Sequence, residues 1–196
     1  MAEVKVLIEG YARQTDEGWQ ASSSAILIED NDRKILVDPG TNRELILEKL
    51  QQEKIGIEDI DIIFLTHNHL DHAFLASMFT KSLILDGTTI YQGDIETEYE
   101  EKIPGTNLEV IYTPGHTLEH CSLLVSTDEG KVIIAGDVFW WEDNKQNNGK
   151  TESLIKEKDP FAQDNKQLEE SRKTLLEMAD WIIPGHGKTF KNPSRP

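Results

Sequence analysis

Three of the six histidines of this 196-residue chain fall within six residues, in the segment His67-Asn-His69-Leu-Asp71-His72. Imidazole and carboxylate groups are ligands of Zn(II), and of Fe or Mn where oxygen ligands contribute. Alternate side chains of an extended segment point to the same side, so His67 and His69 can share one ion. Asp71 and His72 follow where the chain is expected to turn into a helix, so they can point toward a second ion. The cluster therefore predicts metal chemistry.

Three further side chains of the same types follow later in the chain, each after a glycine and near the end of an apolar, strand-like run. His116 stands in TPGHT, Asp137 in AGD and His186 in PGHG. Several strands of one sandwich can end at a shared edge, and loops on a rigid scaffold are where binding groups tend to lie. We therefore expect these residues to join the first cluster. The alternative is that all of them are structural residues at strand ends.

Such a cluster suits two ions rather than one. Two metal ions roughly 3.5–4 Å apart can share a bridging carboxylate and a bridging hydroxide. Metal binding lowers the pKa of that water to about 7, which makes a nucleophile available at neutral pH.

The elements that must position these residues are strands and helices mixed in each half of the chain. Short apolar runs bounded by turn residues predict strands, and apolar residues at helical spacing predict helices. The segment 140–160 is polar and has no clean period, so we expect an insertion or a lid there. The predicted strands cover residues 4–10, 23–30, 34–40, 59–66, 82–92, 107–115, 121–127, 131–137 and 180–185, and the predicted helices 42–54, 71–79 and 165–179.

Composition indicates an ordinary globular protein. Hydrophobic residues make up 37% of the chain and charged residues 29%, and no linker or repeat divides residues 1–196, so we expect one domain. No apolar run approaches the roughly 18 residues that span a bilayer, and the N-terminus lacks a secretory signal pattern. A single cysteine, Cys121, suits a reducing environment. We expect a cytoplasmic protein that does not bind membranes.

The charge balance bears on the substrate. Acidic residues outnumber basic ones by 36 to 20, for a formal net charge of −16. A surface this acidic repels phosphate backbones at long range, which favours a small-molecule substrate and leaves RNA as the alternative.

The segment HNHLDH resembles the H-x-H-x-D-H motif of the metallo-β-lactamase fold superfamily, and TPGHT, AGD and PGHG match the later motifs in order. The resemblance covers essentially the whole chain. It implies a four-layer αββα sandwich of the α/β (α+β) class, in agreement with the mixed elements above. It also implies a ligand set: His67, His69 and His116 for the first metal, Asp71, His72 and His186 for the second, and Asp137 as the bridge.

The activity implied by this resemblance is that of a dinuclear metal-dependent hydrolase. A bridging hydroxide oriented by Asp71, the expected catalytic residue, would attack an ester, thioester, lactone or phosphodiester bond. The cofactor would be two divalent ions, with Zn as the first choice and Fe or Mn as alternatives. The alternative activities are a ribonuclease or phosphodiesterase acting on RNA, and a mononuclear iron oxidoreductase like the persulfide dioxygenases of the same fold. A metal-binding module without catalysis is a third alternative.

Other residues near these motifs receive supporting or structural roles. Asp38 in LVDPG and Thr66 are expected to hold the ligand loops without binding metal. His120 is expected to hydrogen-bond nearby backbone, with a direct substrate role as the alternative. Cys121 is expected to be a small buried residue. Trp140 and Trp141, which follow Asp137 closely, either line the mouth of a substrate pocket or simply pack.

Overall fold

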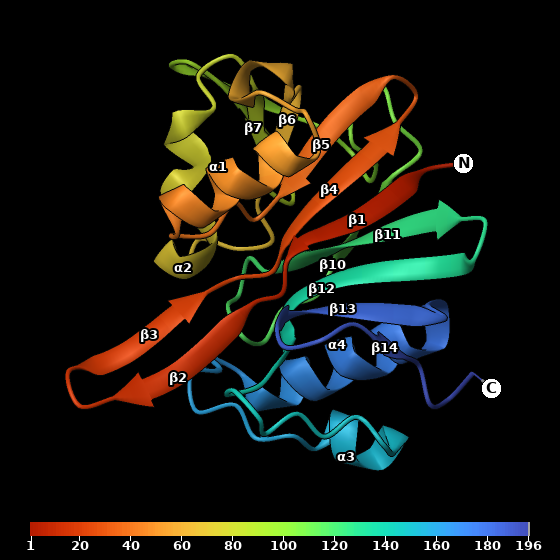
Figure 1. Cartoon of the computed structure of the whole chain (residues 1–196). Coiled ribbons are helices and arrows are strands. Elements are labelled where there is room, and N and C mark those ends of the chain that lie inside the picture. Colours follow the sequence, from red (N-terminus) through yellow and green to blue (C-terminus); the bar gives the residue numbers. More distant parts are fainter. Residues whose placement is uncertain (196) are drawn as a thin grey trace.

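The computed structural model describes residues 1–195, and most of its strands form two sheets that pack face to face (Figure 1). The first sheet has seven strands in the order β1-β4-β5-β6-β7-β8-β9. Its central strands β5, β6 and β7 are parallel, and the outer neighbours pair antiparallel. The strands are β1 (Glu3–Ile8), β4 (Ala25–Asp30), β5 (Arg33–Val37), β6 (Ile62–Phe64), β7 (Leu83–Leu85), β8 (Thr89–Gln92) and β9 (Ile95–Glu98).

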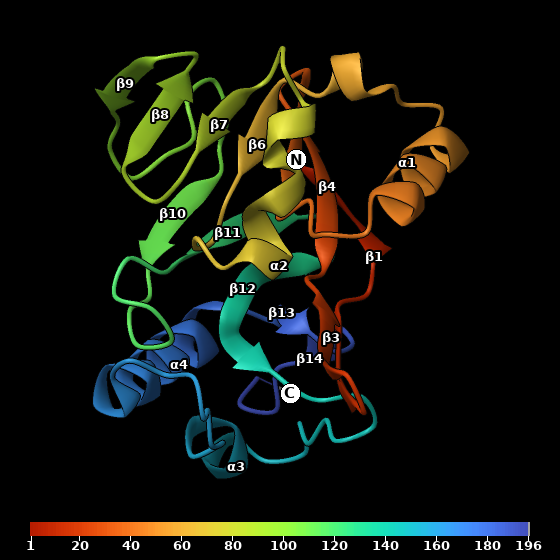
Figure 2. The ribbon, with the colours of Figure 1, turned by 90° about the vertical axis from the view of Figure 1, so that its left-hand side faces the viewer.

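The second sheet has five strands in the order β10-β11-β12-β13-β14. Strands β12 and β13 run parallel, and the register between them shifts on both sides of Gly136. In Figure 2 the ribbon of β12 curves strongly along its length. The strands are β10 (Glu109–Tyr112), β11 (Cys121–Thr127), β12 (Gly130–Trp140), β13 (Trp181–His186) and β14 (Phe190–Lys191).

Helices cover the outer face of each sheet (Figures 1 and 2). Among residues 1–195, no helix is both long and apolar enough to cross a bilayer. Side chains of α1 (Arg43–Gln52) and η2 (Phe74–Met78) pack on the first sheet, and those of α4 (Asn165–Met178) on the second. The remaining helices are η1 (Ile57–Asp59), α2 (Leu70–Ala73) and α3 (Thr151–Ile155).

The period-two alternation of the strands explains the layers. In β5, Ile35 and Val37 point between the sheets, while Leu36 points outward onto α1. In β11, Leu123 joins the core between the sheets, while Leu124 packs on the side of α4. Both faces of each central strand are therefore apolar and buried, as the near-continuous apolar runs predict.

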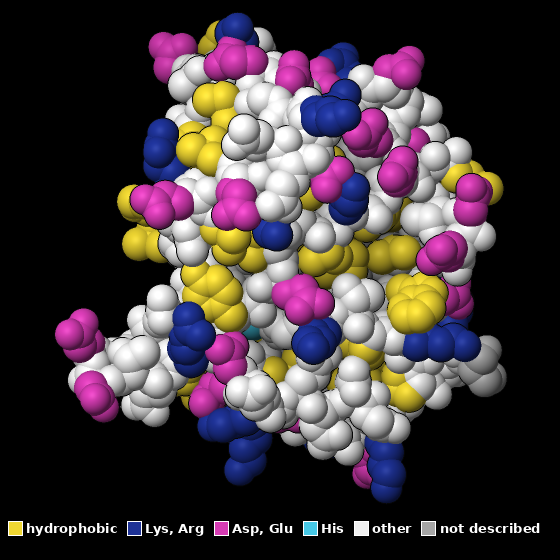
Figure 3. Space-filling view, in the orientation of Figure 1, with side chains coloured by type: hydrophobic (Ala, Val, Ile, Leu, Met, Phe, Trp, Pro, Cys, Tyr) yellow, Lys and Arg dark blue, Asp and Glu magenta, His cyan; other side chains and the backbone are white. Residues whose placement is uncertain are grey.

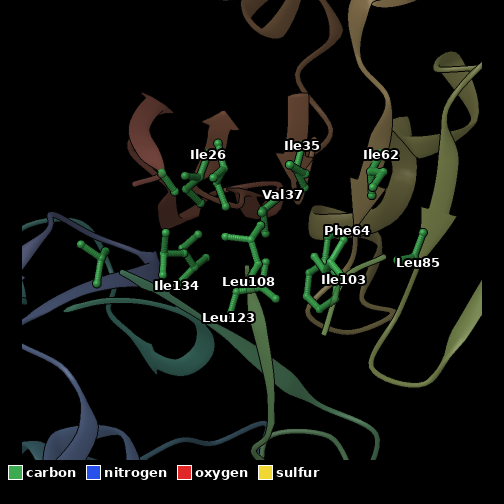
Figure 4. Close-up of a cluster of buried hydrophobic side chains, with 14 of the residues drawn as sticks. Ile26, Ile35, Val37, Ile62, Phe64, Leu85, Ile103, Leu108, Leu123 and Ile134 are labelled. Atoms are coloured by element: carbon green, nitrogen blue, oxygen red, sulfur yellow. The ribbon is translucent and has the colours of Figure 1, made fainter. Parts of the chain in front are cut away.

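The core between the sheets is aliphatic, apart from a few side chains such as Phe64 (Figure 4). Each fully buried side chain of this size contributes about 1.5–3 kcal/mol relative to an exposed one. The four-layer αββα sandwich predicted from the sequence is confirmed. The assignment of residues 1–196 to a single domain stays a prediction.

Three local features differ from the sequence-based expectation. A hairpin of β2 (Tyr11–Thr15) and β3 (Gly18–Ser22) was not predicted, because its sequence has few large apolar residues. The helix expected over 71–79 is divided into α2 and the 3-10 helix η2. The short helix α3 lies within the segment expected to be an irregular insertion.

Candidate metal centre

The predicted ligands converge where strands of both sheets end. His67 and His69 follow β6, Asp71 and His72 lie in α2, and His116 lies in the loop after β10. His186 is the last residue of β13. Asp137 departs from the expectation that it follows a strand, because β12 continues past it to Trp140. Gly136 has a φ of 52° at this point, and the irregularity in the strand directs the Asp137 side chain into the cluster.

The seven side chains form two groups that could each hold a metal ion. Within each group, one candidate ligand atom per residue lies within 4.8 Å of all the others. The first group is His67, His69, His116 and Asp137, and the second is Asp71, His72 and His186.

The Asp137 carboxylate lies between the two groups. Its Oδ2 is 3.3 Å from Nε2 of His116 and 3.9 Å from Nε2 of His67. Its Oδ1 is 3.2 Å from Nε2 of His72 and 3.6 Å from Nε2 of His186. One oxygen therefore faces each group, which is the geometry that a bridging ligand requires.

The unpaired polar atoms of the cluster indicate that it can bind cations. Among the residues described, Nε2 of His67, Nε2 of His72 and Oδ1 of Asp137 are buried and have no hydrogen-bond partner. Leaving such a group unpaired costs about 1–3 kcal/mol, and here three of them converge. In addition, Nδ1 of His69 lies 3.0 Å from Nε2 of His116, a separation that needs a proton or a cation between the two nitrogens. The donors are nitrogen and carboxylate oxygen, which suit divalent transition metals.

Asp38 orients a histidine in each group. Its carboxylate accepts hydrogen bonds from the Thr66 N–H (2.9 Å), the Thr66 hydroxyl (2.7 Å) and Nδ1 of His72 (2.8 Å). Because the Thr66 hydroxyl donates to Asp38, it accepts from Nδ1 of His67 at 3.1 Å. Both imidazoles therefore carry a proton on Nδ1, which leaves Nε2 as the ring atom that can bind a metal ion. Asp38 has a φ of 47°, an uncommon conformation for a non-glycine residue.

His116 is oriented by Asp159, a residue that sequence reasoning missed. Nδ1 of His116 donates to Oδ2 of Asp159 at 2.6 Å, and Asp159 is only 5% exposed. Asp159 lies 43 residues beyond His116, in the polar segment without a period, so no spacing signal pointed to it. His186 is held by backbone instead, since its Nδ1 donates to the Tyr11 carbonyl at 3.0 Å.

His120 supports Asp137 through the backbone. Its Nε2 accepts the N–H of Asp137 at 3.1 Å, so Nδ1 must carry the proton and donate to the Thr113 hydroxyl at 2.9 Å. The Thr113 hydroxyl is in turn hydrogen-bonded to the Ser122 hydroxyl at 2.9 Å. Complete burial lowers the pKa of His120 to about 3, so this imidazole is neutral at physiological pH.

The electrostatics favour an ionised bridge. Burial would raise the pKa of Asp137, but the neighbouring imidazoles of His72 and His186 hold it well below the usual range. Burial likewise works to lower the pKa of His72, yet the carboxylates of Asp137 and Asp38 raise it well above the usual range. Without metal, a proton on His72 thus supplies the positive charge that a bound metal ion would otherwise provide.

Asp71 combines ionisation with access to solvent. Burial opposes ionisation of Asp71, but its contact with the imidazole of His186 keeps its pKa below the usual value. Its Oδ2 lies 3.2 Å from Nε2 of His186, and its side chain is 28% exposed. Cys121 has the opposite character: its thiol is buried beside the Thr66 carbonyl, and burial raises its pKa, so it does not supply a nucleophile.

A cavity of about 410 Å³ opens onto both groups. Trp140 lines it, together with Trp19 and Phe161. The alternative that Trp141 also lines the pocket is wrong, because Trp141 is 5% exposed and packs on Phe139 in the core under α4. Trp140, the last residue of β12, faces the cavity, whereas Trp141 follows the strand and packs in the core beneath α4.

Comparisons with known proteins identify the family. A family model described as the metallo-beta-lactamase superfamily matches residues 18–87. The chain is 33% identical to metallo-beta-lactamase domain-containing protein 1 of Xenopus laevis, over 96% of this chain and 81% of that protein. The chain belongs to the metallo-beta-lactamase superfamily. The sequence resemblance to this superfamily is confirmed.

Two further comparisons agree with this assignment to the metallo-beta-lactamase superfamily. The crystal structure of a candidate metallo-beta-lactamase from Thermotoga maritima has the same fold, with a TM-score of 0.70 at 20% identity, over 97% of this chain and 99% of that one. An N-acyl homoserine lactonase of Bacillus thuringiensis is 28% identical over 60% of this chain and 64% of that protein. The metallo-beta-lactamase fold and the His/Asp cluster imply divalent metal ions in this chain.

Proposed function

We propose that this chain is a dinuclear metal-dependent hydrolase that cleaves an ester, thioester or lactone bond of a small molecule. The observation that carries the proposal is the position of the Asp137 carboxylate, which turns one oxygen toward each ligand group. A site for one metal ion would not explain the second group of Asp71, His72 and His186. The proposal is also supported by the two groups of His and Asp side chains, which include all seven residues expected as ligands.

In this proposal, each ligand group holds one ion, with Zn(II) as the first choice because imidazole predominates. When bound, the two ions supply Lewis acidity and a water that is acidic enough to attack at neutral pH. The first ion is held by His67, His69 and His116, the second by Asp71, His72 and His186, and Asp137 serves both.

The chain's own residues position the reaction and move the protons. Hydrolysis adds water across the acyl–oxygen or acyl–sulfur bond: the water oxygen joins the acyl carbon, and the leaving group takes a proton. Asp71 is ionised, solvent-accessible and at the edge of the cavity, so its carboxylate can accept the proton of the attacking water. Asp38, Asp159 and His120 are too buried to meet substrate, and they keep the ligands in position.

The lactonase relative supports the lactone class, because it combines the same superfamily with cleavage of a cyclic ester. The acidic chain, with its net charge of −16, supports a small molecule over RNA. Metal-loaded protein should be tested on a lactone, a thioester, a β-lactam, a phosphodiester and a short RNA. Turnover of lactone or thioester supports the proposal. Oxygen consumption with a persulfide and one iron per chain, without any hydrolysis, would overturn it in favour of the oxidoreductase.

A further inference from the structure

Exposed apolar side chains are concentrated at the mouth of the candidate metal centre. Among residues 1–195, eight large apolar side chains are exposed, and three of them, Trp19, Leu70 and Phe161, line the one 410 Å³ cavity. Scattered single apolar residues are normal on a surface, but a contiguous group beside a reactive centre marks a binding surface.

Three aromatic rings from distant segments form one wall of this cavity. The ring centroids of Trp19 and Phe161 are 6.0 Å apart, and those of Phe161 and Trp140 are 5.6 Å apart. Trp140 in turn lies 6.2 Å from the ring of His186. The wall, defined as Trp19, Phe161 and Trp140, therefore runs without a break from the β2–β3 hairpin to a metal-ligand candidate.

The wall is also tied to the metal centre by Asp159. One oxygen of this carboxylate accepts the Nδ1–H of His116, and the other accepts the backbone N–H of Phe161 at 2.9 Å. The N–H of Gln163 donates to the His116 carbonyl at 3.1 Å. Phe161 is thus held in a fixed position relative to a metal-ligand candidate, although its own ring is half exposed.

Positive charge is directed away from the cavity. Within the part of the chain described, no Lys or Arg side chain lines it. In the hairpin, Ala12 and Ala21 are register partners and face the cavity, so the next pair, Arg13 and Gln20, faces the opposite side. Arg13 donates there to Gln20 at 2.8 Å.

The tip of the hairpin, at residues 16–17, is acidic instead, and Figure 3 shows acidic side chains at the projecting end of this hairpin. A nucleic acid that placed one phosphate at the metal centre would bring its neighbouring phosphates against apolar rings and negative charge. Those phosphates would find no cation, although the bases could stack on the rings.

From these observations we propose that the aromatic wall binds an uncharged, apolar chain attached to the acyl or alcohol side of the scissile bond. The proposal rests on the hydrolase function above and names its substrate class: small esters, thioesters or lactones that carry an alkyl or aryl group. Trp19 and Phe161 determine the specificity, because they are the exposed rings that such a group would cover.

The test uses metal-loaded protein and γ-lactones that bear ethyl, butyl or hexyl side chains, so that the reacting ring stays constant. We expect kcat/KM to rise about threefold per added methylene, mainly through a lower KM. Trp19→Ala and Phe161→Ala should each lower the ratio of kcat/KM for the hexyl lactone to kcat/KM for the ethyl lactone by about tenfold. Trp19→Phe should restore most of the dependence on chain length. Gln20→Ala, on the same strand but the opposite face, is the matched control and should match the wild type.

A binding measurement on metal-free protein separates this proposal from the proposed function. Octanamide should quench tryptophan fluorescence and bind at least tenfold more tightly than butanamide. This ratio corresponds to four additional methylenes, each of which contributes less than the free energy of full burial. Trp19→Ala should remove the difference in affinity between the two amides. Hydrolysis with no dependence on chain length, or equal binding of the two amides, would overturn the proposal while leaving the hydrolase intact. Tighter binding of the dinucleotide adenylyl-adenosine than of octanamide would overturn it in favour of RNA. Binding as expected without any hydrolysis would contradict only the proposed function.

Discussion

Asp71 shows how one carboxylate can serve two purposes at the residue scale. Its oxygen lies 3.2 Å from Nε2 of His186 in the second ligand group, and its side chain borders the substrate cavity. In contrast, Asp38 and Asp159 are buried and do not line the cavity. They accept hydrogen bonds from Nδ1 of His72 and His116.

Asp71→Asn separates these two purposes. Asparagine keeps one oxygen ligand and the shape of the side chain but removes the charge and the proton acceptor. We expect this variant to retain much of its metal and to lose about 10²–10⁴-fold in kcat if proton transfer to Asp71 occurs. Metal analysis and turnover on the same sample measure both quantities. Near wild-type turnover in metal-loaded Asp71→Asn would show that the attacking water needs no help from this carboxylate.

Asp159 acts through His116. Asp159→Ala removes the acceptor that holds the imidazole proton on Nδ1, so metal affinity of the first group should fall by about 10–100-fold. Competition with a chelator measures the change. Asp164→Ala is a suitable control from the same segment, because the Asp164 side chain caps α4 by accepting hydrogen bonds from Lys166 and Gln167. An unchanged metal affinity in Asp159→Ala would show that this hydrogen bond does not support the site.

At the scale of elements, the site depends on close packing between β12 and β13. A Cβ added at Gly185 would lie 1.9 Å from Oδ1 of Asp137, and one added at Gly136 would lie 2.6 Å from Nε2 of His120. Both contacts are far shorter than any real Cβ contact. The glycines therefore allow the two strands to bring Asp137 and His186 together.

Gly185→Ala should displace the bridging carboxylate or separate the strands. We expect loss of both metals and a decrease in the free energy of unfolding of about 2 kcal/mol or more, since overpacking typically costs 1–3 kcal/mol. Metal analysis and thermal unfolding measure these effects. Gly149→Ala offers a control, because a Cβ there meets no atom within 4 Å. A Gly185→Ala protein with wild-type metal content would contradict the bridging geometry.

The elements also show why the sequence predicted some features and not others. The sandwich was predictable because its strands are apolar on both faces, and the candidate ligands could be named because they stand in recognisable motifs. Asp159 was not predictable, since its partner His116 is 43 residues away and nothing in the sequence marks the pair. The β2–β3 hairpin was missed because its inward residues include Ala12 and Ala21, which are too small to produce a strand-like pattern. Trp141 was ambiguous until the direction of β12 decided which tryptophan faces the cavity.

At the scale of the whole molecule, metal binding should be coupled to protons. The pKa of His72 is raised in the metal-free protein, so this imidazole is protonated near pH 7 and must release a proton before it can bind a metal. Apparent Zn(II) affinity should therefore increase as the pH rises toward that pKa. Calorimetric titration in buffers of different ionisation enthalpy should reveal net proton release at pH 7. Binding with no proton release would show that His72 is neutral in the free protein.

The central claim, that one carboxylate joins two metal sites, is tested most directly by counting metals in the wild type and in Asp137→Ala. Metal-replete wild-type protein should contain close to two ions per chain, since each ligand group can hold one. Asp137→Ala should lower occupancy at both sites together, because each loses an oxygen ligand. A wild-type stoichiometry of one in excess Zn, Mn or Fe, or an Asp137→Ala protein that keeps two tightly bound ions, would contradict the account.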